Sequence, residues 1–130
     1  MAYLLDTPTL AEVLRSSPSR ALVRRLSTIP TPARWTSAAT VSQPLVAALR
    51  TQQPRLMQDV VNLVAGIRVA PFDLAAAQSF AKFRATVGAQ LEADDVMQAA
   101  IAASSGMTLV TKRIQHYGVF PTLRLEDWTV

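Results

Sequence analysis

The sequence lacks cysteine and contains a single histidine, His116. The absence of cysteine excludes a disulfide framework, a thiolate metal site and a cysteine nucleophile, and it suits a reducing compartment, so we expect a cytoplasmic protein. One histidine cannot build a metal site or catalytic pair that needs two. No apolar run approaches the ~20 residues that cross a bilayer, and no basic region precedes the apolar start. We therefore expect neither a membrane span nor a signal peptide.

Acidic residues are scarce in the first half of the chain. Lysine and arginine total 13 against 9 aspartates and glutamates, a formal net charge of +4. No acid lies between Glu12 and Asp59, a stretch that contains a block of arginines: Arg15, Arg20, Arg24, Arg25 and Arg34. Two interpretations stay open. The block favours contact with a polyanion or a partner protein, because arginine suits phosphate oxygens, or it is an ordinary solvated helix surface.

At 130 residues, half of them apolar, the chain is long enough for one domain, which we place at residues 1–130. Apolar runs predict strands at 3–5, 34–38, 67–72, 108–111 and 123–125. Helical spacing predicts helices over 9–15, 19–28, 40–49, 55–65, 74–86 and 93–104. Strands that alternate with helices indicate a parallel sheet covered on both faces. The predicted fold class is a three-layer α/β/α sandwich with a central sheet of four to five parallel strands.

Local signals refine the helix starts. Thr9 with Glu12 three residues later forms a capping-box pattern, which predicts a helix that begins at Thr9. Pro44 is expected within the first turn of the helix over 40–49. Asp73 is expected to cap the helix over 74–86, and Asp94 to cap the helix over 93–104 and to face water.

Two acids are candidates for a functional site. Asp6 follows the first predicted strand, and Asp95 lies at the start of the helix over 93–104. In a parallel α/β sheet, ligands collect at the carboxyl ends of the strands, where Asp6 and Thr111 would both lie. Asp95 could instead serve only to complement the helix dipole. We favour a role in the site, because Asp6 should lie nearby.

Three segments resemble one known family. Residues 3–12 carry Tyr-Leu-Leu-Asp-Thr followed by a helix with Glu12, and residues 36–43 carry a hydroxyl-rich run that ends at Gln43. Asp95 with Ala99-Ala100 and the strand at 106–111 form the strongest match. In order and spacing, the sequence resembles PIN-domain nucleases of the VapC toxin type.

This resemblance implies a PIN-like fold and a specific function. The chain would be a Mg²⁺- or Mn²⁺-dependent endoribonuclease toxin of a toxin–antitoxin module. Asp6 and Asp95 would hold the metal and, with the residues at positions 43 and 113, form the catalytic site. The implied partners are a second copy of the chain as a homodimer, a cognate antitoxin and RNA.

The sequence departs from the family pattern where the chemistry requires acids. Gln43 stands in place of an acid, and Arg113, His116 and Tyr117 occupy positions where the family carries Asn or Asp, an acid and an aromatic. A misplaced unit charge at ~4 Å is worth about 4 kcal/mol at an effective dielectric constant near 20, enough to weaken metal binding by orders of magnitude. We expect Arg113 to lie between Asp6 and Asp95 as a substitute for the metal, so that no cofactor binds.

Three functional hypotheses follow. The first is the active ribonuclease toxin. The second, which Gln43 and Arg113 favour, is a catalytically inactive PIN-like module that binds nucleic acid or protein. The third is an unrelated α/β domain. His116 is expected to be structural or incidental, with a general base as the minor alternative.

Overall fold

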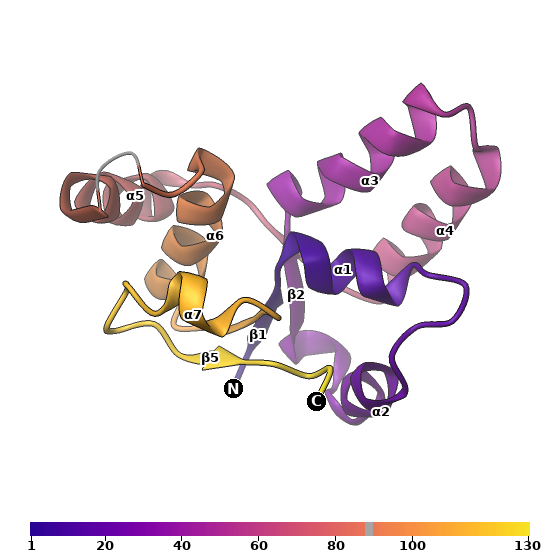
Figure 1. The fold of residues 1–130 in the computed structure, drawn as a ribbon, viewed down its shortest axis with the longest axis horizontal. Helices are drawn as coiled ribbons and strands as arrows, with labels where there is room; N and C mark the ends of the chain where they lie inside the picture. Colours follow the sequence, from indigo (N-terminus) through magenta and orange to yellow (C-terminus); the bar gives the residue numbers. More distant parts are fainter. Residues whose placement is uncertain (88–89) are drawn as a thin grey trace.

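The computed structural model describes residues 1–87 and 90–130. Five parallel strands form one sheet in the order β3-β2-β1-β4-β5, with β1 at its centre. This confirms the predicted three-layer fold with a parallel sheet (Figure 1). The strands are β1 (Tyr3–Leu5), β2 (Arg34–Ser37), β3 (Arg68–Ala70), β4 (Thr108–Val110) and β5 (Leu125–Glu126).

The helices follow the predicted order, with two short additions that the sequence analysis did not foresee. These additions are the 3₁₀ helix η1 (Thr31–Ala33) and the single-turn helix α7 (Ile114–Tyr117). The other helices are α1 (Thr7–Val13), α2 (Arg20–Thr28), α3 (Ala38–Arg50), α4 (Pro54–Ala65), α5 (Leu74–Val87) and α6 (Ala93–Ser104). None of the described helices is long and apolar enough to cross a membrane.

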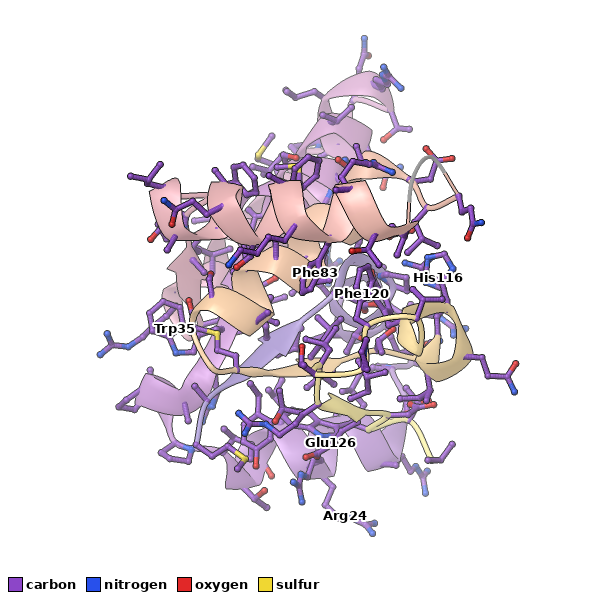
Figure 2. The ribbon with its side chains drawn as sticks, turned by 90° about the vertical axis from the view of Figure 1, so that its left-hand side faces the viewer. Arg24, Trp35, Phe83, His116, Phe120 and Glu126 are labelled. Carbon is purple, nitrogen blue, oxygen red and sulfur yellow. The ribbon has the colours of Figure 1, made fainter. Side chains whose placement is uncertain are left out.

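Alternate residues of the central strands serve opposite faces of the sheet, as the pleat requires. Leu4 and Leu109 belong to the larger core, which packs under α5, α6 and α7. In Figure 2, Phe83 of α5 and Phe120 lie together beneath α5, with ring centroids 4.6 Å apart. Leu5 and Val110 point into a second core against α2. Burial on both faces explains why these strands are continuous apolar runs.

Two predicted helix starts and one predicted helix cap were wrong. Asp6, and not Thr9, caps α1, and Asp6 Oδ1 accepts a hydrogen bond from Thr9 N at 2.9 Å. The α3 helix begins at Ala38 because Ser37 caps it, so Pro44 lies beyond the first turn and inside the helix. Asp94 faces water as expected but does not cap α6, because the N-cap residue there is Glu92.

The other boundaries agree closely with expectation. Asp73 caps α5 by accepting from Ala76 N at 2.9 Å, and Gly66 ends α4. Four predicted strands are shorter or shifted: 34–38 ends at Ser37, 67–72 narrows to β3, 108–111 ends at Val110, and 123–125 moves to β5. These differences concern strand ends, where ladder pairing and not the apolar pattern sets the limit.

Candidate functional site

The carboxyl ends of three adjacent strands define the site. Asp6 follows β1, Ser37 ends β2 and Thr111 follows β4, and these strands are neighbours in the sheet. Figure 1 shows β1 and β2 running up to the starts of α1 and α3. Because all the strands are parallel, their last residues meet at one edge, which is where α/β folds place ligands.

Asp6 is fully buried at this edge. Its Oδ1 caps α1, whereas its Oδ2 has no hydrogen-bond partner among the residues that the structure describes. A buried carboxylate oxygen without a partner is costly, and such groups in native structures call for an explanation. Asp6 therefore has a helix-capping role and, in addition, one oxygen that the fold leaves unused.

Asp95 is 9% exposed and receives hydrogen bonds on both carboxylate oxygens. Arg113 donates from Nη2 to Oδ1 at 2.7 Å and from Nη1 to Oδ2 at 3.4 Å. Tyr117 donates its hydroxyl to Oδ1 at 3.2 Å, and His116 Nε2 lies 2.9 Å from Oδ2. Asp95 is thus the centre of a polar cluster and more than a helix-dipole residue.

Electrostatics favour an ionised Asp95, a charged Arg113 and a protonated Tyr117. Burial alone would raise the pKa of Asp95, but the hydrogen bonds from Arg113 and His116 outweigh it and the pKa is lowered. The carboxylate in turn raises the pKa of Arg113. Burial and the negative charge of Asp95 raise the pKa of Tyr117, so its hydroxyl stays protonated and can donate.

The turn after β4 explains how Arg113 reaches Asp95. Thr111 is buried, and its Oγ1 accepts a hydrogen bond from Arg113 N at 2.9 Å. This turn leads directly into α7, so that His116 and Tyr117 follow three and four residues after Arg113. Residues at that spacing share one side of a helical turn, and all three therefore face Asp95.

Arg113 lies against Asp95, as expected, and the negative charge of Asp6 adds to the effect of Asp95 in raising the pKa of Arg113. The guanidinium is directed at Asp95, but within the described residues no hydrogen bond joins it to Asp6. His116 was expected to be structural or incidental, and the structure gives it structural contacts: it is one of three side chains at Asp95, with Arg113 and Tyr117, and its ring also packs edge-on against Tyr117.

A second polar cluster was missing from the sequence analysis. Gln98 Nε2 donates to Ser37 Oγ at 2.9 Å and to Thr40 Oγ1 at 2.5 Å, and Thr40 Oγ1 lies 3.2 Å from Thr7 Oγ1. The carbonyl oxygen of Gln98 is buried without a partner among the described residues. A polar residue three positions after Asp95, on an alanine-rich helix face, was the signal that could have revealed it.

A cleft of about 390 Å³ lies over the site, and both Asp95 and Arg113 line it. Gln43 reaches this cleft, so all but one of the predicted site residues line it, the exception being buried Asp6. Glu92 and Asp94 also line it but are exposed. The cleft therefore carries acids at its rim and an ion pair at its base.

The donor set does not fit the divalent metal that the resemblance implies. Over residues 1–87 and 90–130, no group of three or more His, Asp or Glu side chains is arranged to hold a metal ion. Mg²⁺ and Mn²⁺ require several free hard oxygen ligands, whereas both oxygens of Asp95 are engaged and Gln43 carries no charge. Among the buried carboxylate oxygens that the structure describes at this edge, Asp6 Oδ2 is the one without a partner, while Glu92 and Asp94 place their carboxylates at the exposed rim.

The arginine block does not contribute to this site. Arg25 pairs with Glu126 at 3.3 Å and lies over the Trp128 ring, and Arg34 donates to the carbonyl of Ile29. Arg24 is exposed on α2, and Figure 2 shows it far from His116. Part of the block therefore stabilises the fold. Exposed Arg15 does not line the cleft but lines a neighbouring hollow together with Thr7 and Gln43, which border both.

Comparison with known proteins decides the family, because residues 3–113 match the PIN domain. The chain belongs to the PIN-domain family. The hypothesis of an unrelated α/β domain is thereby excluded. The PIN-domain chain is also 25% identical over 132 residues to the tRNA(fMet)-specific endonuclease VapC of Salmonella typhimurium, with 98% of each chain covered.

Solved structures extend this similarity to the fold of the PIN domain. The DNA-bound VapBC structure from Salmonella typhimurium matches with a TM-score of 0.90 and 25% identity, covering 98% of each chain. The FitAcB structure from Neisseria gonorrhoeae matches with a TM-score of 0.76 and 28% identity, covering 98% of this chain and 99% of the other. The chain is therefore VapC-like over almost its whole length.

Proposed function

We propose that this chain is the VapC-like member of a toxin–antitoxin pair, with an antitoxin protein as its partner and RNA as its target. The full-length similarity to a VapC endonuclease and to VapBC complexes supports both parts of the proposal. The site agrees with it in position, because Asp6 and Asp95 are held at the carboxyl edge of the sheet beside an open cleft.

Two forms of this function differ in chemistry. In the first, the chain is a Mg²⁺- or Mn²⁺-dependent endoribonuclease that acts through Asp6 and Asp95. In the second, it is a PIN module that binds RNA or protein without metal-dependent hydrolysis. The ion pair between Arg113 and Asp95 favours the second form, because the carboxylate that would hold a metal is already neutralised. We carry the second form forward as the conclusion.

Expression in a bacterial host tests the proposal. We expect the wild-type chain to form a complex with the product of a small neighbouring antitoxin gene. Any growth arrest that the chain causes should be relieved when that product is co-expressed.

RNA extracted from arrested cells distinguishes the two forms of the function. Intact RNA supports binding without hydrolysis, whereas new cleavage ends that are lost in Asp95→Asn support hydrolysis. Asp59→Asn is the matched control, since Asp59 is exposed on α4 and does not line the cleft. The absence of a complex, of arrest and of RNA binding would contradict the proposal.

A homodimer and a cytoplasmic location remain part of the proposal. Size-exclusion chromatography with light scattering, on the chain alone and with its antitoxin, measures the first. The exposed side chains on α3 and α4, among them Leu49 and Val61, are the apolar surface that such assembly could cover.

A further inference from the structure

The first observation behind the inference is that Asp95 has no free acceptor position. A carboxylate offers about two acceptor positions on each oxygen. Oδ1 accepts from Arg113 and Tyr117, and Oδ2 accepts from Arg113 and lies against His116. A metal ion could bind Asp95 only by displacing one of these groups.

The second observation is the charge at the base of the cleft. Asp6 and Asp95 contribute two negative charges, and Arg113 contributes one positive charge directly against Asp95. Gln43 at the same cleft adds none. A divalent cation between Asp6 and Asp95 would therefore meet one net negative charge and a fixed guanidinium as its neighbour, which is unfavourable for binding. Glu92 and Asp94 add negative charge at the rim of the cleft, where they are exposed and water screens them.

The third observation is that the guanidinium is held in place by more than Asp95. Thr111 Oγ1 fixes the backbone of Arg113, Arg113 Nη2 also donates to the Tyr117 hydroxyl at 3.3 Å, and the guanidinium carbon lies 5.5 Å from the centre of the Tyr117 ring. An arginine with two-point contact to a carboxylate and a ring beneath it is a specific arrangement that lysine cannot reproduce.

We propose that Arg113 is the built-in cation of this centre and that its ion pair with Asp95 excludes a divalent metal. The guanidinium neutralises and orients Asp95, the task that the metal ion of the implied nuclease would perform. The inference goes beyond the proposed function and holds for the isolated chain, with or without antitoxin and RNA.

Calorimetric titration of the purified chain with Mn²⁺ tests this inference directly. We expect no saturable binding by the wild type at millimolar Mn²⁺. The paired substitution Gln43→Glu with Arg113→Asn should bind Mn²⁺ at least roughly a hundredfold more tightly, since it removes one positive charge and adds one negative charge. Adding Asp95→Asn to that pair should abolish the gained binding. Arg24→Asn, on an exposed arginine outside the cleft, is the matched control and should leave the chain metal-free.

Two results would overturn the inference. One is micromolar Mn²⁺ binding by the wild type that is lost in Asp95→Asn or in Asp94→Asn, because the cleft would then hold a metal despite Arg113. The other is a folded paired variant that still binds no Mn²⁺, because Arg113 would then not be the cause of exclusion.

A second measurement keeps the inference testable if the paired variant does not fold. Mn²⁺ broadens nuclear magnetic resonance signals close to it, so amide signals of α6 and α7 in the wild type should keep their width at millimolar Mn²⁺. Selective broadening around Asp95 and Arg113 would contradict the inference. Neither measurement involves RNA or an antitoxin, so failure of the proposed function would not be mistaken for failure here.

Discussion

Arg113 and Asp95 form a two-point ion pair that joins the turn after β4 to the first turn of α6. The two residues are 18 positions apart in the sequence, and both line the cleft. The side chain of Asp95 is 13% exposed and that of Arg113 is 37% exposed, so water screens the pair only in part. The pair therefore connects the sheet edge to the helix and also fixes the charge of the site.

Removing Arg113 should destabilise the fold. Arg113→Ala leaves Asp95 ionised, mostly buried and short of its strongest donor, and we expect a loss of about 1–3 kcal/mol in the free energy of unfolding. Urea denaturation of Arg113→Ala, Asp95→Asn and the double variant measures the coupling, which should be about 1 kcal/mol. Arg24→Ala is the control and should stay within about 0.5 kcal/mol of the wild type. Additive single effects would contradict a stabilising pair.

Two substitutions of Asp6 separate the stabilising effect of its helix cap from the cost of its buried charge. Asp6→Asn retains an oxygen that can cap α1 and removes a buried charge whose Oδ2 has no partner in the described part of the chain, so we expect unchanged or higher stability. Asp6→Ala should lose about 1 kcal/mol with the cap. Ser19→Ala, which removes the cap of α2, gives the matched cost of a cap alone. Equal destabilisation by Asn and Ala would show that the charge itself stabilises the fold.

Glu12 should give the protein a pH-dependent stability. The hydrogen bond from Lys112 and that from the backbone of Ser19 lower the pKa of Glu12 from 4.5 to about 2. Because the folded-state pKa is depressed, the contribution is complete above pH 4.5 and is lost as the pH falls towards about 2. Urea midpoints measured across that window should fall less steeply with acidification in Glu12→Gln than in the wild type.

The exposed Glu92 provides the control for this pH dependence, since Glu92→Gln should follow the wild-type curve. Parallel curves for Glu12→Gln and the wild type would show that Glu12 contributes nothing in this range. The distances make that outcome unexpected, because Lys112 Nζ lies 3.0 Å from Glu12 Oε1 and Ser19 N lies 3.0 Å from Oε2.

Much of the fold could be predicted because local chemistry and tertiary structure agree. The runs at Tyr3–Leu5 and Thr108–Val110 are buried on both faces, so their composition alone identified them as strands. Ser19 and Asp73 cap helices through their own side chains. The prediction failed where a residue far along the chain determines the contact. Thr9 was expected to cap a helix, but its hydroxyl instead donates to the carbonyl oxygen of Val110, 101 residues later.

The same contrast between local signals and distant partners explains which site residues could be predicted. Asp6 and Asp95 could be proposed from the sequence because each adjoins a recognisable strand or helix. Arg113 was also expected beside Asp95, because the resemblance to the family placed it at the site. The contacts of His116 and Tyr117 with Asp95 could not be predicted, since both residues lie in a single-turn helix with too few residues to show a periodic pattern. Gln98 escaped because its partners, Ser37 and Thr40, are about sixty residues earlier, and only the sheet order brings them together.

Among the glycines that the structure describes, Gly106 is the one with a positive φ. It follows α6 with φ +66°, the left-handed region that side chains rarely adopt, although a Cβ there would meet no atom within 4 Å. Gly106→Ala should therefore lower the free energy of unfolding by about 1 kcal/mol through backbone strain alone.

Gly66→Ala is the matched control, because Gly66 ends α4 with φ −104° and a Cβ would lie 3.8 Å from Leu63 O, an ordinary contact. That substitution should be neutral or stabilise by up to about 1 kcal/mol. Thermal denaturation of both variants measures the difference, and equal effects would show that the turn after α6 adapts to a side chain without strain.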